Sequence, residues 1–256
     1  MTIMSKLTKG VKSVGHISIF FYKILSGYPR KTIHLYECLL QLFFSGVLTL
    51  IIILLSGIFI GCVLAIQGSY ILEMFAAESQ LGQLITLTIF RELGPVVSAL
   101  LFTGRAGSSL TSEIGVMQLT EQIDALKAMC IKPKQYLLFP RFFGVLISLP
   151  LLTIIFNAFA ILGGHLTAIY WLNIDIGTFW MNIKSNVSFT HDVATGIFKS
   201  VIFAVTIGIT SLYQGYYSIK SAEGIAQSAT KTVVYSSVLI LLFDLLLTAL
   251  MMRIWQ

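Results

Sequence analysis

Long runs of apolar residues dominate the chain, and short segments rich in charge separate them. A helix needs about 20 apolar residues to cross the hydrocarbon core of a bilayer. Irregular backbone cannot face lipid, so each run is predicted to be a membrane-spanning helix. The five predicted spans cover approximately residues 39–66, 84–104, 142–172, 193–214 and 233–253.

The second of these runs carries Arg91, Glu92, Gly94 and Pro95 in its middle. Ionisable residues inside a span are costly and usually face a cavity or a partner. Neighbouring residues on a helix point about 100° apart, so the two charges need not pair with each other. Pro95 cannot donate to the carbonyl of Arg91, and a helix broken at membrane depth commonly lines a substrate path. The alternative is that both charges lie at the outer interface and that Gly-Pro is only a kink.

Lys and Arg residues indicate the orientation of the spans, because they gather on the cytoplasmic side. With the N-terminus inside and the C-terminus outside, 13 of the 17 basic residues fall in inner segments. These are Lys6, Lys9, Lys12, Lys23, Arg30, Lys31, Arg105, Lys127, Lys132, Lys134, Arg141, Lys220 and Lys231. An N-in, C-out topology is therefore predicted.

Residues 1–32 are predicted to form an amphipathic helix rather than a span. Apolar residues recur there at steps of three and four, from Met4 to Ile24, while the lysines lie mostly off that stripe. Such a basic helix suits the inner-leaflet interface. Packing on another protein is the alternative.

Small residues recur four apart in three of the predicted spans, as at Gly57, Gly61 and Ala65. Similar stripes begin at Ala160 and Gly196. Small residues let helices approach closely in lipid, so each stripe could form a dimer seam or pack within one subunit.

The segment 113–129 is polar enough to leave the membrane, because Glu113, Glu121 and Asp124 interrupt its apolar residues, which include Leu126. We predict one short cytoplasmic helix there. It could dock on a cytoplasmic motor, or it could be a solvated loop helix.

Composition excludes a soluble or a disordered chain. Of 256 residues, 56% are hydrophobic and 11% are charged, against about 25% charged in ordinary globular domains. The net charge of +6 is therefore a topology signal rather than a nucleic-acid signal. No Gly is followed by Lys, so the chain lacks a Walker A loop, and its scattered Cys and His residues do not favour a metal site. Asp244, inside the fifth run, is expected to bond a neighbouring helix, with a proton relay as the less favoured reading.

An ordered series of motifs resembles the MlaE (YrbE) permease family. The series runs from Arg91-Glu92-Leu93-Gly94-Pro95-Val96 through Gly104-Arg105-Ala106-Gly107-Ser108 and Glu113-Ile114-Gly115 to Thr120-Glu121-Gln122-Ile123-Asp124-Ala125. Further similar stretches include Lys199-Ser200-Val201-Ile202-Phe203 and Ala249-Leu250-Met251. The resemblance covers roughly residues 40–252.

The resemblance implies an all-α permease domain over residues 33–256 that forms a homodimer in the inner membrane of Gram-negative bacteria. It implies two cytoplasmic ABC ATPase subunits that bind ATP and Mg²⁺, a STAS-domain subunit, and a periplasmic hexamer of MCE domains. The substrate would be phospholipid, and the system would maintain outer-membrane lipid asymmetry. The chain itself would need no cofactor.

Site residues follow from matching positions. Arg91, Glu92, Pro95 and Phe75 would border the lipid cavity, where Arg91 could meet a phosphate. Glu113, Glu121, Asp124 and Leu126 would belong to the part that couples to the ATPase. Two other functions stay open: a proton-coupled transporter that uses Glu92 or Asp244, and a non-transporting anchor for a periplasmic assembly.

Overall fold

The computed structural model describes residues 15–16, 18–22, 24 and 33–254 of the chain. These residues form helices and connecting turns, with no strand among them. Five of the described helices are long and apolar enough to cross a membrane: Tyr36–Glu73, Glu78–Leu119, Lys134–Tyr170, His191–Tyr216 and Ala222–Arg253. The prediction of an all-α protein with five spans is confirmed, and most of these helices extend beyond the predicted apolar runs.

Several spans contain wide π turns between α-helical segments; these turns are labelled η1 and η3 to η6, whereas η2 is a short 3₁₀ helix. In chain order the elements are α2 (Ile33–Leu42), η1 (Phe43–Val47), α3 (Leu48–Glu73), η2 (Glu78–Gln80), α4 (Leu81–Thr88), η3 (Ile89–Leu93), α5 (Gly94–Phe102), η4 (Thr103–Gly107), α6 (Ser108–Leu119), α7 (Gln122–Ala128), η5 (Lys134–Leu138), α8 (Phe139–Tyr170), α9 (Ile176–Asn186), η6 (Phe189–Val193), α10 (Ala194–Tyr216) and α11 (Ala222–Ile254).

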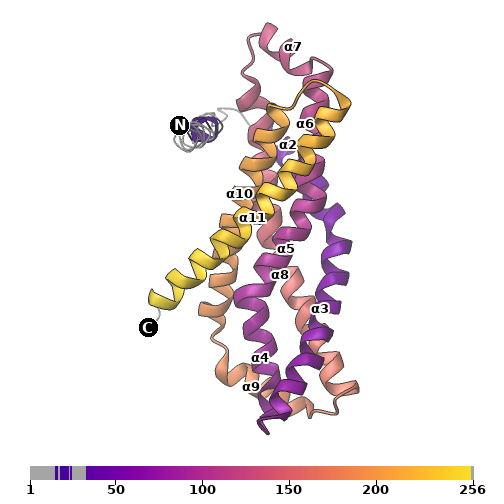
Figure 1. The fold of residues 1–256 in the computed structure, drawn as a ribbon, viewed down its shortest axis with the longest axis vertical. Helices are drawn as coiled ribbons and strands as arrows, with labels where there is room; N and C mark the ends of the chain where they lie inside the picture. The colour runs from indigo at the N-terminus through magenta and orange to yellow at the C-terminus, as the bar shows by residue number, and fades with distance from the viewer. Residues whose placement is uncertain (1–14, 17, 23, 25–32, 255–256) are drawn as a thin grey trace, which may run out of the picture.

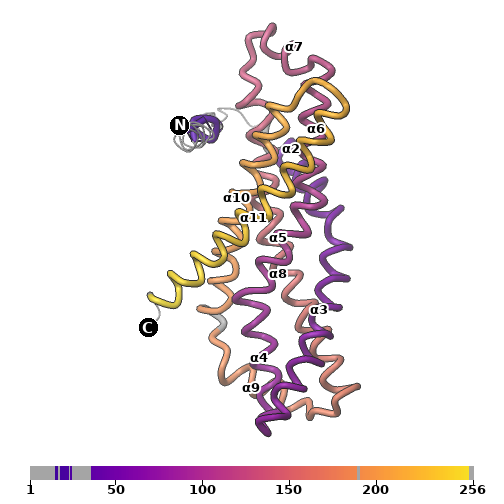
Figure 2. The backbone as a smooth tube through the Cα atoms, viewed as in Figure 1, coloured from indigo at the N-terminus to yellow at the C-terminus, as the bar shows by residue number. Residues whose placement is uncertain are grey.

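The helices form an elongated bundle with α8 at its centre, packed against α2, α3, α5 and α10 (Figures 1 and 2). The short helix α7 lies at one end of the bundle and α9 at the other. Helix α11 packs on α6 near its start and on α10 as far as Thr248, and its C-terminal end points away from the bundle axis (Figure 1). The bundle therefore has two distinct ends, and α11 lies at its side with most of its surface not covered by other helices.

Small residues allow α3 and α8 to pack almost backbone to backbone. A Cβ added at Gly57 would lie 3.0 Å from the Phe156 carbonyl oxygen, and one at Gly61 would overlap the Ala160 carbonyl. The stripe on α10 is also used internally, since a Cβ at Gly196 would overlap the Phe90 carbonyl. These stripes therefore pack within one subunit, which was one of the two alternatives.

The expectation of a break at Gly94-Pro95 is wrong. The backbone N–H of Gly94 donates to the carbonyl of Ile89, five residues back, so η3 widens the helix without interrupting it. Pro95 then stands in the first turn of α5, where a missing N–H costs least. The second span is a continuous helix whose wide turn carries Arg91 and Glu92.

The expected single helix over residues 113–129 is also wrong. Helix α6 continues the second span to Leu119, and Glu121 then adopts a left-handed conformation with φ of 60°. Helix α7 begins only after this turn. Because a left-handed residue cannot continue an α-helix, Glu113 and Asp124 stand on separate helices.

The described part of the N-terminal segment is helical and packs on the bundle. Phe20 is buried, and its ring centroid lies 5.6–5.9 Å from those of Tyr213, Tyr216 and Tyr217. Ile24 is buried as well. The predicted amphipathic helix therefore has a face against its own chain, and the rest of 1–32 lies outside the described residues.

Candidate functional site

Arg91 and Glu92 bind different partners, as their angular separation predicted. The Nε of Arg91 donates to Oδ1 of Asp192 over 2.7 Å. The Oε2 of Glu92 accepts from Nζ of Lys199, also over 2.7 Å. Arg91 and Glu92 are thus each neutralised by a residue at the start of the fourth span, 101 and 107 positions later.

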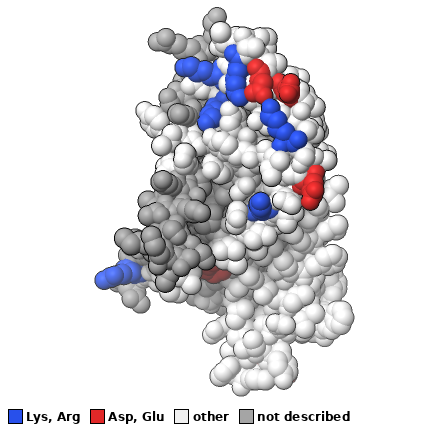
Figure 3. Space-filling model, turned by 45° about the horizontal axis from the view of Figure 1, so that its top comes forward, with Lys and Arg blue, Asp and Glu red and all other residues white. Residues whose placement is uncertain are grey.

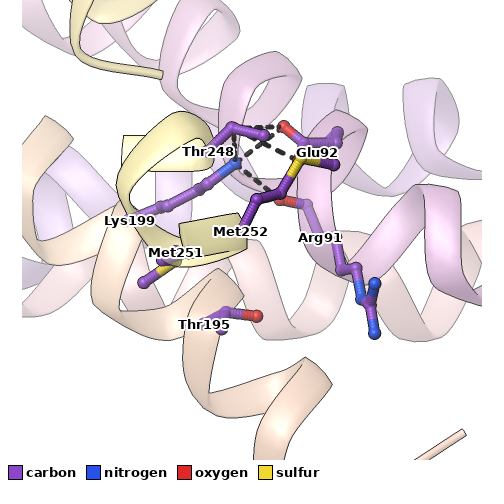
Figure 4. A pocket seen from close by; sticks show the side chains of 7 residues that line it. All are labelled: Arg91, Glu92, Thr195, Lys199, Thr248, Met251 and Met252. Carbon is purple, nitrogen blue, oxygen red and sulfur yellow. Dashed lines mark hydrogen bonds and ion pairs between the residues drawn. The ribbon is translucent and has the colours of Figure 1, made fainter. Parts of the chain in front are cut away.

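Lys199 is the centre of this polar cluster, and its side chain is 2% exposed. Besides Glu92, its ammonium group donates to Asp244 Oδ1 at 3.0 Å and to Thr248 Oγ1 at 2.7 Å. It also donates to the carbonyl oxygen of Arg91 at 2.9 Å. In an α-helix this carbonyl would accept from the backbone N–H of residue 95, which proline lacks. The dashed lines in Figure 4 show several of these bonds converging on one nitrogen.

Pairing explains how a lysine is tolerated at this depth. A buried charge is costly unless it is paired and fully hydrogen-bonded, and an ammonium has three donors to distribute. Thr248 adds a hydroxyl within 3.1–3.2 Å of both Glu92 carboxylate oxygens. The expected contact between Asp244 and a neighbouring helix is confirmed. From the sequence, Lys199 was known only as part of a stretch similar to the permease family, and neither Glu92 nor Asp244 was predicted as its partner.

A pocket of about 440 Å³, its open mouth included, adjoins the cluster. Its lining residues are Arg91, Glu92, Thr195, Lys199, Thr248, Met251 and Met252. The guanidinium of Arg91 points away from the Lys199 cluster (Figure 4), and its side chain is 51% exposed. The pocket therefore combines an anchored, accessible cation with two flexible apolar side chains, a combination that suits an anionic amphiphile.

The other two predicted cavity residues do not line this pocket. Pro95 is buried in α5, where its ring faces Gly196 of α10. Phe75 stands in the turn after α3 and is 74% exposed. A contact of either residue with substrate stays a prediction.

The four residues predicted to couple to a motor lie in two places. Glu113 accepts from Nη2 of Arg141 over 2.6 Å, so it is tied to α8. Asp124 in α7 pairs with Lys127 at 2.7 Å and Lys220 at 2.8 Å. Glu121 is exposed beside it, and Leu126 is half-buried.

Hydrogen bonds from Lys127 and then Lys220 lower the pKa of the Asp124 carboxyl to about 2, and the bond to Asp124 in turn raises the pKa of Lys127. Figure 3 shows basic and acidic side chains gathered at one end of the molecule, while much of the remaining visible surface is uncharged. The exposed charges of α7 thus form a compact group that fits a water-facing end of a membrane bundle.

Comparison with known proteins agrees with the motif series. The family model described as Permease MlaE matches residues 38–250. The chain is 44% identical over 240 residues to the intermembrane phospholipid transport system permease protein MlaE of Haemophilus influenzae, covering 94% of this chain and 92% of the relative. It is 35% identical over 253 residues to a probable ABC transporter permease protein of Rickettsia felis, covering 99% and 97%.

A probable ABC transporter permease protein of Synechocystis is 32% identical over 215 residues, covering 83% of this chain and 81% of the relative. The matched region contains all five membrane helices almost completely, together with the pocket and α7. The chain is a multi-pass membrane protein and belongs to the MlaE permease family.

Proposed function

We propose that the chain is the transmembrane subunit of an ABC transporter that moves phospholipid between the inner membrane and a periplasmic MCE carrier, and so maintains outer-membrane lipid asymmetry. The observation that carries this proposal is Arg91, half exposed in a pocket and anchored by the buried Asp192. The printed name of the Haemophilus relative, a phospholipid transport permease, supports it.

In this proposal the guanidinium of Arg91 binds the lipid phosphate. Its Nε donates to Asp192, so the two Nη groups can donate hydrogen bonds to one or two phosphate oxygens. Lys199 fixes Glu92 in the pocket wall and bonds the Arg91 carbonyl, so the turn that carries Arg91 is held from the side. Met251 and Met252 offer adaptable apolar contact for acyl chains.

The motor is proposed to be a separate cytoplasmic ATPase that binds ATP and Mg²⁺ and docks near α7. The chain has no Walker A loop, and around α7 exposed apolar residues stand among the charges. These exposed residues are Val116, Leu119, Met129 and Ile131. A water-facing end with such a mixed surface fits a protein partner. Lipid movement that survives ATP depletion but stops when the proton gradient collapses would replace this motor with proton coupling.

The assembly is proposed to follow the family. The α7 end faces the cytoplasm and the α9 end the periplasm of a Gram-negative cell, which gives the N-in, C-out topology. Two copies form a homodimer, with a STAS-domain subunit on the ATPase and an MCE-domain hexamer above. Helix α11 supports this, since it exposes a row of apolar residues, among them Val238, Leu242 and Leu245, that a second copy or lipid would cover.

Quantifying the lipid that copurifies with the transporter tests the proposal. The Arg91→Ala variant and its parent are extracted gently from native membranes, and phospholipid per complex is measured by mass spectrometry. Loss of a charge-assisted hydrogen bond predicts about tenfold less lipid, with partial recovery in Arg91→Lys. Lys184→Ala, which removes an exposed cation outside the pocket, is the matched control. Equal lipid in Arg91→Ala and Lys184→Ala would contradict a phosphate contact at Arg91.

A further inference from the structure

A second pocket lies in the half of the bundle that carries α7, between η1, η4, α6 and the start of α8. It holds about 330 Å³, its open mouth included. Its polar lining residues are Gln41, Ser45, Arg105, Ser109, Glu113 and Arg141. Two arginines face one carboxylate there, so the pocket carries an excess positive charge.

Arg141 forms a fixed part of this pocket. Its side chain is 9% exposed, with Nη2 bound to Glu113 at 2.6 Å and Nη1 to the Leu137 carbonyl at 2.8 Å. Its Nε is buried and has no hydrogen-bond partner among the described residues. Because Glu113 already neutralises Arg141, the surplus charge resides on Arg105.

Arg105 is partly exposed and has no carboxylate within ion-pair distance in the described part of the chain. Its Nη1 donates to the Phe44 carbonyl at 2.8 Å, a bond that fixes the side chain. Its Nε and Nη2 make no hydrogen bond to described residues. These two groups form one edge of the guanidinium, the edge that binds phosphate oxygens in bidentate fashion.

The rim of the pocket is apolar and faces outward. Phe44 lines the pocket and is 51% exposed, and its neighbours Leu40, Phe43 and Val47 are exposed too. These apolar side chains would not stabilise a free ion that enters from water. A phospholipid, by contrast, would place its phosphate on Arg105 and bury its acyl chains against these side chains.

We propose that this second pocket binds a phosphate anion, presented as the headgroup of a phospholipid from the leaflet on the α7 side. The inference rests on the proposed function and extends it. Arg91 and Arg105 stand on one continuous helix, 14 residues and about 21 Å apart. The first pocket and this one would thus take headgroups at two depths of the same membrane.

Photocrosslinking in native membranes tests this proposal with the full chain in its complex. Benzoylphenylalanine replaces Phe44 in cells whose phospholipids are labelled with ³²P, and the adduct is measured after illumination. Ser109→Asp adds a negative charge to the pocket without removing a hydrogen bond, and Ser109→Asn is its isosteric control. We expect Ser109→Asp and Arg105→Gln to lower the Phe44 adduct at least about tenfold, and Ser109→Asn to leave it unchanged.

The same probe at Phe59, exposed on α3 outside both pockets, reports non-specific lipid contact and should not respond to these variants. A Phe44 adduct that is equally insensitive would overturn the proposal. So would retention of ³²P inorganic phosphate, sensitive to Ser109→Asp, with no lipid on Phe44, because the ligand would then be free phosphate.

A probe at Met252 separates this inference from the function on which it rests. Lipid on Met252 but none above background on Phe44 would reject the second pocket alone. Absence of lipid from Met252 would instead count against the first pocket and the proposed function.

Discussion

The ammonium nitrogen of Lys199 lies 2.9 Å from the carbonyl oxygen of Arg91, the one carbonyl that Pro95 leaves without its usual helical donor. A side chain from the fourth span thus supplies a hydrogen bond to a backbone carbonyl of the second span. The same nitrogen pairs with Glu92 and Asp244, so one lysine joins three spans. The pocket wall depends on this junction.

Replacing Lys199 with Met is expected to destabilise the protein strongly. The substitution keeps an apolar stem but leaves Glu92 and Asp244 close together without their cation, and breaking such a buried pair costs about 3 kcal/mol. Thermal unfolding in nanodiscs measures the effect. Thr248→Val, which removes a hydroxyl and no charge, should cost about 1 kcal/mol. A Lys199→Met protein as stable as Thr248→Val would refute the central role of the lysine.

The pair formed by Arg91 and Asp192 is expected to show coupling. Arg91→Ala strands the carboxylate of Asp192, which is 1% exposed, whereas the double variant Arg91→Ala/Asp192→Asn replaces that carboxylate with a neutral amide. Because the double variant removes the stranded Asp192 carboxylate and leaves the Lys199 cluster intact, it should unfold at a higher temperature than Arg91→Ala alone, with a coupling energy of about 1–3 kcal/mol. Strict additivity of the two substitutions would show that the bond contributes nothing to stability.

Close packing of α3 on α8 predicts that Gly61→Ala is harmful. The added methyl group would overlap the Ala160 carbonyl, and overpacking of this kind costs about 1–3 kcal/mol. Gly104→Ala is the matched control, since nothing lies within 4 Å of a Cβ there. Denaturation curves of the two variants should separate clearly. If both match the parent, α3 and α8 are not in backbone contact.

Acid should loosen α7 within a defined pH range. The folded pKa of Asp124 is lowered to about 2 from its ordinary 3.8, so its bonds to Lys127 and Lys220 stabilise α7 fully above pH 3.8. This contribution is lost as pH falls from 3.8 through about 2. Because the carboxyl is exposed, we expect a small, salt-sensitive effect. Pepsin cleavage near α7, corrected with a peptide substrate, should rise over this range.

Asp124→Asn provides the control for this titration. Its amide does not titrate, so pepsin cleavage near α7 should already be higher than in the parent at pH 4 and should change little between pH 4 and 2. A variant whose cleavage rises as steeply as the parent's would assign the acid response to another group.

Much of the fold could be predicted from the chain alone, and the polar site only in part. The apolar runs identified all five membrane-crossing helices of the described residues, and Arg91 and Glu92 were recognised because charges are rare inside such runs. Their partners could not be identified, since Asp192 and Lys199 follow more than 100 residues later. Glu113 was predicted to contact the ATPase because nothing in its own segment indicates that it pairs with Arg141 of α8.

The sequence by itself determined which segments form membrane-crossing helices, because lipid requires about 20 apolar residues and a fully bonded backbone. Only the tertiary structure decided how Gly94-Pro95 is accommodated and where Lys199 and Arg105 meet their partners. The membrane spans follow from local composition, whereas a buried charge takes its partner from whatever helix packs against it. That choice depends on the angle and depth of packing, which small residues such as Gly61 and Gly196 set through contacts across the bundle.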